Sequence, residues 1–258
     1  MSISERYQRG LTTLYKIGGD EGLAPLNALA EIAPDLARYT VEFAYGDILS
    51  RPILDLRTRE LCTVAALAAM GRAPTQLRYH IRGALNAGCL PSDVVETVML
   101  CVVYAGFPAA LNGLFAVREV FQERTLNGAA APDDGSPDRH ARGMLAFAQL
   151  HGETGAGFLR DVQETAPELA RYLIEFGYGD ILARAALADR IKALATIALL
   201  TALATTQPQL VAQIGAALKA GATRDEIVEA IQQMALYAGF PAAFNGIAAA
   251  RAAYAQIQ

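Results

Sequence analysis

The apolar and polar residues of this chain follow a helical pattern. Within residues 75–87, for example, Leu77, Ile81, Ala84 and Leu85 fall on one stripe of a helix. No segment shows the sustained alternation of β-branched residues that marks a strand, and the abundant Ala, Leu, Glu, Arg and Gln residues favour helix. The sequence therefore predicts an all-α protein. In the first half we expect helices at residues 3–17, 23–32, 34–47, 56–71, 75–87, 92–104 and 108–125.

Residues that end or begin helices lie between these segments. Gly88 follows one expected helix as a C-terminal cap, and Pro91 opens the next. Further along, Thr223 and Glu226 have the spacing of a capping box.

The helical pattern occurs twice. Residues 36–54 return at 169–187, and residues 104–113 return at 237–246, both with an offset of 133. A repeat of this kind indicates two similar domains rather than one large one. We expect a first domain at 1–126, a linker rich in Gly, Pro and Asp at 127–137, and a second domain at 138–258.

Two polar residues of the first copy lie on or beside apolar stripes. Glu60 belongs to a helix whose continuation is apolar on every side, and His80 lies beside the inward stripe of the next helix. At the offset of 133 they become Ala193 and Gln213, so the fold does not require them. They are therefore candidates for a functional pair. Alternatively, Glu60 forms an ion pair with Arg57 at a helix start, and His80 is a half-buried histidine with one hydrogen bond.

Three other residues are weaker candidates for binding a substrate. Arg57 lies near the face of Glu60. The second copy also has an arginine at this position, Arg190, although it lacks the Glu. Tyr104 and Asn112 are kept in both copies, so a packing role is the default for them. By contrast, Arg78 and Arg82 lie opposite His80 on their helix and are expected on a solvated face.

Composition and charge exclude several classes of function. The net charge of −4, without a basic block, disfavours nucleic acid as a partner. The polar N-terminus predicts no signal peptide, and the longest apolar stretches are too short to span a membrane. Three cysteines without metal or disulfide spacing suggest reduced thiols in the cytoplasm. One Glu and one His do not make a usual metal site, so no metal is expected.

The motifs around the candidate pair resemble those of the γ-carboxymuconolactone decarboxylase family. The resemblance covers about residues 34–121 and, more loosely, 167–254. It rests on Leu56-Arg57-Thr58-Arg59-Glu60-Leu61, on His80 with Gly83-Ala84-Leu85, and on Tyr104-Ala105-Gly106-Phe107-Pro108-Ala109-Ala110.

The resemblance implies two tandem helical repeats of the alkylhydroperoxidase D type, with Glu60 and His80 as active-site residues. It implies a decarboxylase without cofactor that converts 4-carboxymuconolactone, or a similar carboxylated lactone of aromatic catabolism, to an enol-lactone. Fused copies would form a built-in dimer, and three chains would complete a ring of six domains. Arg57, Tyr104 and Asn112 are the expected substrate-binding residues, and the second copy is expected to be structural and oligomerising.

Other functions stay open on the same fold. One is another lyase or isomerase acting on a lactone or β-keto acid, and another is a peroxidase-like redox protein. The peroxidase branch has a C-x-x-C motif before its His, where this chain has Ala73 and Gln76, which disfavours disulfide-based chemistry. The remaining alternative is an oligomeric scaffold without catalysis.

Overall fold

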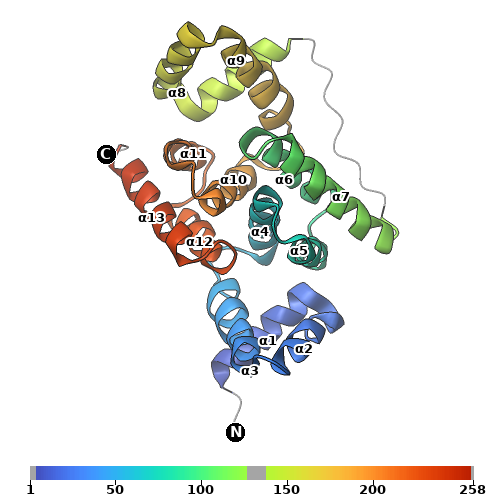
Figure 1. Ribbon diagram of the computed structural model, residues 1–258. Coiled ribbons are helices and arrows are strands. Elements are labelled where there is room, and N and C mark those ends of the chain that lie inside the picture. The colour runs from blue at the N-terminus through green and yellow to red at the C-terminus, as the bar shows by residue number, and fades with distance from the viewer. Residues whose placement is uncertain (1–3, 127–137, 257–258) are drawn as a thin grey trace.

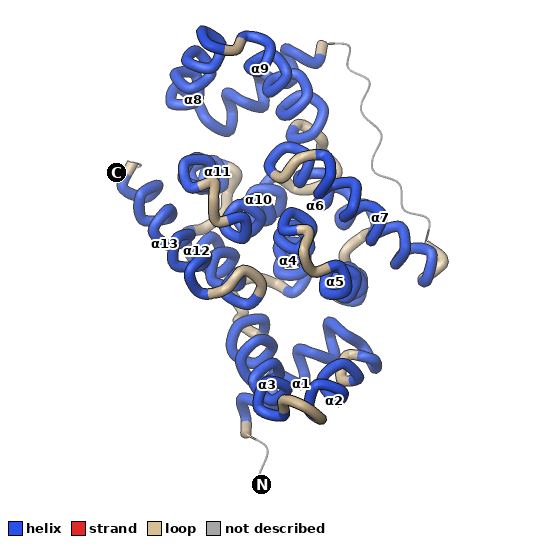
Figure 2. The backbone as a smooth tube through the Cα atoms, in the orientation of Figure 1, coloured by secondary structure: helices blue, strands red, loops and turns tan. Residues whose placement is uncertain are grey.

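The computed structural model describes residues 4–126 and 138–256, and every regular element in these ranges is a helix (Figures 1 and 2). The expected linker at 127–137 lies outside the described residues. The first copy contains α1 (Glu5–Gly18), η1 (Gly19–Glu21), α2 (Ala24–Ala30), α3 (Pro34–Tyr39), η2 (Thr40–Leu49), α4 (Leu56–Met70), α5 (Pro74–Asn86), α6 (Pro91–Tyr104) and α7 (Phe107–Glu123).

The second copy repeats this order with small differences. Its long helix α8 bends at Gly152, whose φ of 61° matches that of Gly19 at the equivalent position in the first copy. Only glycine adopts this backbone readily, so the bend divides α8 into counterparts of α1 and α2. The copy contains α8 (Arg139–Thr165), α9 (Pro167–Tyr172), η3 (Leu173–Leu182), α10 (Asp189–Leu203), α11 (Gln207–Lys219), α12 (Arg224–Gln233), η4 (Met234–Leu236) and α13 (Phe240–Ala255).

The helices expected from the sequence are confirmed, with one correction. The segment 34–47 is not a single α-helix, because the α3 helix continues as the π-helix η2. The second copy repeats this change at η3. The π-helix packs closely on α1, since a Cβ on Gly10 would lie 2.0 Å from the carbonyl oxygen of Val41. Hydrophobic spacing cannot separate the two windings, because both place apolar residues on one face.

The expected helix ends are also confirmed. Gly88 has a φ of 91° and closes α5 with a Schellman motif, in which the Cys89 N–H donates to Ala84 and the Gly88 N–H to Leu85. Thr223 and Glu226 form a reciprocal capping box at the start of α12.

The centre of the molecule is formed by α4 and α10, which pack against each other and are buried on nearly every side (Figure 1). The remaining helices α5–α7 and α11–α13 cover this pair, while the first helices of each copy form lobes at opposite ends (Figure 1). Contacts between the copies are reciprocal, as expected for a pseudo-two-fold pair. They include the ion pairs Arg51–Glu229 and Arg184–Glu96 and the ring contacts Phe43–Phe240 and Phe107–Phe176.

Among the described helices, none combines the length and the apolar character needed to cross a membrane.

Candidate active site

Glu60 and His80 meet in the interior of the first copy. Asp55 caps α4 through the Thr58 N–H, and Glu60 follows in the first turns of that helix. Its side chain is fully buried, and its Oε2 lies 2.8 Å from Nδ1 of His80 on α5. His80 is 5% exposed. The sequence alone could not say whether the two groups are in reach of each other, and the structure brings them into a hydrogen bond.

The two oxygens of Glu60 differ in their surroundings. Oε2 binds the imidazole, whereas Oε1 is buried and has no hydrogen-bond partner among the described residues. A carboxylate on Nδ1 orients the ring and favours the tautomer in which Nδ1 carries the hydrogen. Nε2 is then the ring nitrogen that stays available for proton exchange, and Oε1 is a buried oxygen whose hydrogen-bonding capacity is unused among the described residues.

Gly83 makes the contact possible. A Cβ at this position of α5 would lie 2.6 Å from Oε2 of Glu60 and 2.7 Å from Ile17. A methyl group there would displace the carboxylate from the imidazole. The equivalent residue of the second copy is Ala216, in the copy that has no Glu.

Tyrosines surround the imidazole. The rings of Tyr79 and Tyr237 both meet His80 edge to face, with ring centroids 5.2 Å apart in each case. The hydroxyls of Tyr45 and Tyr79 lie 3.1 Å apart. Burial raises the pKa of all three phenols, and the charge of Glu60 adds to this. The site therefore contains neutral hydroxyl groups beside one carboxyl–imidazole pair.

The equivalent position of the second copy holds a different set of groups. Gln213 replaces the imidazole and donates from Nε2 to the Tyr104 hydroxyl at 3.0 Å. His151, which has no counterpart imidazole in the first copy, lies 2.7 Å from the Tyr178 hydroxyl. Burial lowers the pKa of His151 to about 4. These groups are neutral and form two hydrogen-bonded pairs, Gln213 with Tyr104 and His151 with Tyr178, which suits a structural role.

Arg57 does not pair with Glu60. Its half-exposed guanidinium lies 3.3 Å from Asp93 at the start of α6. The second copy repeats this contact as Arg190 with Glu226, although it has no Glu at the position of Glu60. The ion pair that would have explained Glu60 without function is therefore not formed.

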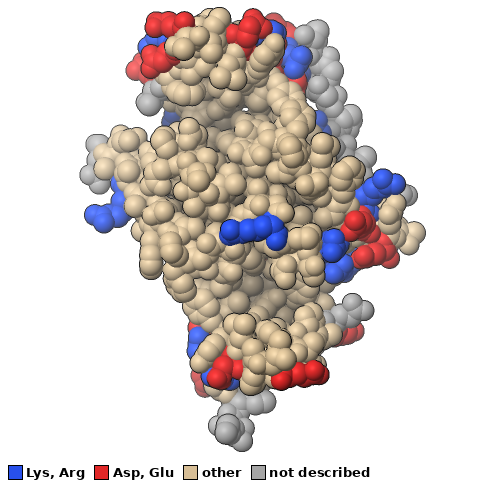
Figure 3. Space-filling view, in the orientation of Figure 1, with Lys and Arg blue, Asp and Glu red and all other residues tan. Residues whose placement is uncertain are grey.

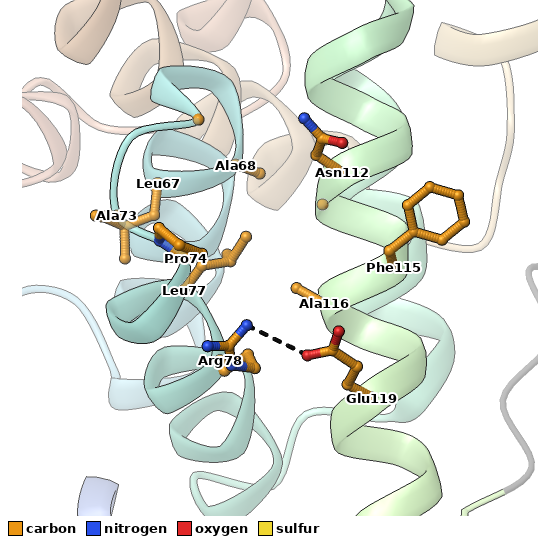
Figure 4. Close-up of a pocket in the computed structure, with 12 residues that line it drawn as sticks. Leu67, Ala68, Ala73, Pro74, Leu77, Arg78, Asn112, Phe115, Ala116 and Glu119 are labelled. Carbon is orange, nitrogen blue, oxygen red and sulfur yellow. Dashed lines mark hydrogen bonds and ion pairs between the residues drawn. The ribbon is translucent and has the colours of Figure 1, made fainter.

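Tyr104 and Asn112 have other surroundings than the Glu60–His80 contact. Tyr104 contacts Gln213 of the second copy, as described above. Asn112 lines a pocket of about 300 Å³ between α4, α5 and α7 (Figure 4). In this pocket Arg78 pairs with Glu119 of α7 (Figure 4), and Arg82 pairs with Glu123 one turn further on. Both arginines are partly exposed, in keeping with an outer face.

The cysteines do not suit redox chemistry. Cys62, Cys89 and Cys101 are buried and free, and burial raises the pKa of each thiol to about 12. Thiols of this kind are poor sources of the thiolate that attacks peroxides or disulfides. Within the described residues there is also no cluster of three or more possible metal ligands.

Gly83, Tyr45, Tyr79 and Tyr237 belong to this site but were not among the residues predicted for it. Gly83 differs between the copies together with Glu60 and His80, so the alignment of the copies contained the signal. Tyr237 comes from the second copy and is identical to Tyr104 at the offset of 133. Its place beside His80 follows from the pairing of the two copies, which the sequence does not specify.

Comparison with known proteins identifies one matching family and several related proteins. The sequence model described as the carboxymuconolactone decarboxylase family matches residues 34–119 and again 167–252. A 4-carboxymuconolactone decarboxylase of Acinetobacter baylyi is 33% identical over 124 residues, which are 48% of this chain and 92% of that protein. A nitrosuccinic acid decarboxylase of Metarhizium robertsii is 29% identical over 34% of this chain and 60% of that protein. An uncharacterised 15.0 kDa protein of Paracoccus denitrificans is 32% identical over 38% and 74%, respectively.

Proposed function

The chain belongs to the carboxymuconolactone decarboxylase family, and on that premise we propose that it is a decarboxylase with one active site, formed around Glu60 and His80. Its substrate is 4-carboxymuconolactone or a similar carboxylated lactone of aromatic catabolism, and its product is the enol-lactone. The reaction proceeds without a cofactor, because the lactone itself accepts the electrons that the departing carboxyl group leaves behind.

One observation carries this proposal. A buried carboxyl–imidazole contact of 2.8 Å occurs in the copy whose counterpart has Ala193 and Gln213 at the same positions. Burying a carboxyl group is unfavourable unless it is paired, and the second copy folds without either group. The identity of 33% to nearly the whole of a 4-carboxymuconolactone decarboxylase supports the reaction class.

The chemistry divides into two steps. The bond between the ring carbon and its carboxylate breaks, and its electron pair moves through the ring double bond onto the lactone carbonyl oxygen as CO₂ leaves. His80 then donates a proton to the ring carbon next to that carbonyl, and the enol-lactone forms. Glu60 holds the imidazole by Nδ1 and stabilises its charged form, and neutral phenols such as Tyr79 can donate a hydrogen bond to the enolate oxygen.

Binding of the substrate carboxylates by Arg57, Tyr104 and Asn112 stays a prediction. Arg57 is committed to Asp93, and the other two lie at Gln213 and in the α4–α5–α7 pocket. Single alanine variants that raise KM without lowering kcat would support such a role.

A second candidate is the decarboxylation of another small acid. The similarity to a nitrosuccinic acid decarboxylase favours it, because the two relatives are named for different substrates. Both candidates need the same proton donor, so they share the Glu60–His80 site and differ in substrate.

We further propose that three chains form a ring of six domains in the cytoplasm. Large apolar side chains are exposed at equivalent positions of the two copies, on α7 and α13. Figure 3 shows charged side chains on the two end lobes and at the right side of the central part, whereas much of the remaining central surface carries few of them. Patches of this kind suit contacts between copies of the chain. They include Phe107, Leu111, Phe115, Phe240 and Phe244. Light scattering should then give three times the chain mass of 27.4 kDa.

The test of function is a decarboxylation assay on the purified full chain. We expect turnover of 4-carboxymuconolactone with release of CO₂, and loss of at least about a hundredfold in His80→Ala. Gln213→Ala, at the equivalent position of the second copy, should keep the wild-type rate. Turnover that is the same in wild type, Glu60→Ala and His80→Ala would overturn the proposal. Turnover of nitrosuccinic acid alone would favour the second candidate.

A further inference from the structure

His80 is held by groups from both copies of the chain. Glu60 fixes its Nδ1, and two tyrosine rings meet it edge to face, one from the neighbouring residue Tyr79 and one from Tyr237. The interplanar angles are 85° and 89°. Because rings packed in this way restrict the rotation of the ring between them, Tyr237 limits the orientations open to the imidazole.

A buried network connects the segment that carries Tyr237 to the helix that carries Glu60. Gln233, which is fully buried at the end of α12, donates from Nε2 to the Arg59 carbonyl and to the Thr63 hydroxyl, each at 2.8 Å. The Arg59 guanidinium, also fully buried, donates to Glu229 at 2.7 Å and to Gln233 at 3.2 Å. Tyr237 follows this anchor by one turn of the 3₁₀-helix η4.

Among the residues that the structure describes, this network is present on one side of the pseudo-two-fold axis and not on the other. The equivalents of Gln233 and Arg59 are Leu100 and Lys192. In the first copy α6 runs without interruption to Tyr104, whereas α12 ends at Gln233 and gives way to η4. The extra hydrogen bonds and the changed winding therefore occur where the partner residue is His80, and not where it is Gln213.

We infer that Tyr237 is a positioning residue for the first copy's site, supplied by the second copy and placed by Gln233. It acts through His80, whose imidazole it holds in the orientation set by Glu60. This inference rests on the proposed function for its effect on turnover, but its effect on the imidazole does not depend on any substrate. The second copy is then a part of the active site and not only a structural partner.

The test combines turnover with the nitrogen spectrum of His80 in the full chain. The chain has three histidines, so ¹⁵N-histidine labelling with a His80→Gln reference identifies the signal. Wild type should give one set of shifts, with the hydrogen on Nδ1. In Tyr237→Ala that signal should broaden or move, and kcat should fall by about tenfold with KM changed by less than about twofold. Tyr237→Phe keeps the ring and should restore both.

Matched variants make the result decisive. Gln233→Leu introduces the residue that the first copy has at the equivalent position, Leu100. It should disturb the His80 signal in the same direction as Tyr237→Ala. Tyr104→Ala removes the equivalent tyrosine and should leave that signal unchanged. Circular dichroism establishes whether each variant is folded. If Tyr237→Ala does not fold, Tyr237→Leu is used in its place. A His80 signal that is the same in wild type and Tyr237→Ala would overturn the inference. If no lactone is turned over, the proposed function fails, and the spectrum still decides this point.

Discussion

The two copies place the same helices around two interiors that hold different groups. The first interior holds Glu60, His80 and Gly83, and the second holds Ala193, Gln213 and Ala216 at the same positions. The helices that carry these positions have equivalent bounds in both copies, α4 with α10 and α5 with α11, so they do not depend on the carboxyl–imidazole contact. What differs is the set of residues that allows a buried charge to approach an imidazole. The comparison shows that Glu60, His80 and Gly83 all differ between the two copies, so the glycine belongs to the same set as the acid and the imidazole.

The supporting tyrosines differ in the same way. In the first copy the Tyr45 hydroxyl lies beside that of Tyr79, and Gly18 leaves room for the second ring. In the second copy Ala212 replaces Tyr79, and His151 replaces Gly18 and binds the Tyr178 hydroxyl instead. A neutral histidine therefore hydrogen-bonds to the Tyr178 hydroxyl in the second copy, where a tyrosine hydrogen-bonds to the equivalent hydroxyl of Tyr45 in the first.

The largest expected effect comes from making the first copy like the second at the acid. Glu60→Ala removes the group that orients the imidazole, and kcat/KM should fall by about 10²–10⁴. The rate of CO₂ release measures the loss. Glu60→Gln keeps a hydrogen-bond acceptor and should retain more activity than Glu60→Ala. Equal rates in wild type and Glu60→Ala would show that the difference between the copies has no catalytic meaning.

The buried ion pair between the copies should contribute most to stability. Arg59→Ala leaves Glu229, which is 2% exposed, with Arg51 alone, and should lower the free energy of unfolding by about 3–5 kcal/mol. Lys192→Ala at the equivalent position removes bonds to two carbonyl oxygens and to the exposed Asp189, and about 1–3 kcal/mol is expected. Urea denaturation distinguishes them, and equal losses would contradict the account.

The glycine should matter in one copy only. Gly83→Ala places a methyl group against Glu60 and Ile17, so we expect lower turnover and a loss of about 1–3 kcal/mol of stability. The reverse change, Ala216→Gly, should cost about 0.5–1 kcal/mol through backbone entropy and leave the rate unchanged. Thermal unfolding and the decarboxylation rate are measured on both. An unchanged rate in Gly83→Ala would separate the glycine from the catalytic set.

The second interior should respond to acid. The pKa of His151 in the folded chain is about 4, below the ordinary value of 6.5, so the unfolded chain binds more protons between these values. The contribution of the neutral His151 to the free energy of unfolding is fully present above about pH 6.5. It is lost as the pH falls toward 4, and for a partly exposed group this loss is about 1–2 kcal/mol. His151→Gln should flatten this dependence in urea denaturation, whereas His140→Gln at the surface should not.

Much of the fold could be predicted from the sequence because helix signals are local. The spacing of apolar residues and the caps at Gly88 and Thr223 depend on a few neighbouring residues. The π-helix η2 was not predicted because its side chains follow nearly the same period as those of an α-helix.

The site divides in the same way. The asymmetry at Glu60 and His80 was visible once the copies were aligned, and so was the change at Gly83. The ion pair of Arg57 could not be seen in this alignment, because its partner Asp93 lies on another helix. The placement of Tyr237 depends on how the copies pack against each other, which no local pattern contains.

The central claim is that His80 donates the proton and that Gln213 does not replace it. The most direct measurement is the decarboxylation rate of His80→Gln, a chain in which both interiors carry glutamine, beside wild type under the same conditions. We predict a folded chain, judged by circular dichroism, whose turnover of 4-carboxymuconolactone is lower by at least about a hundredfold. A folded His80→Gln chain that works at the wild-type rate would contradict the account.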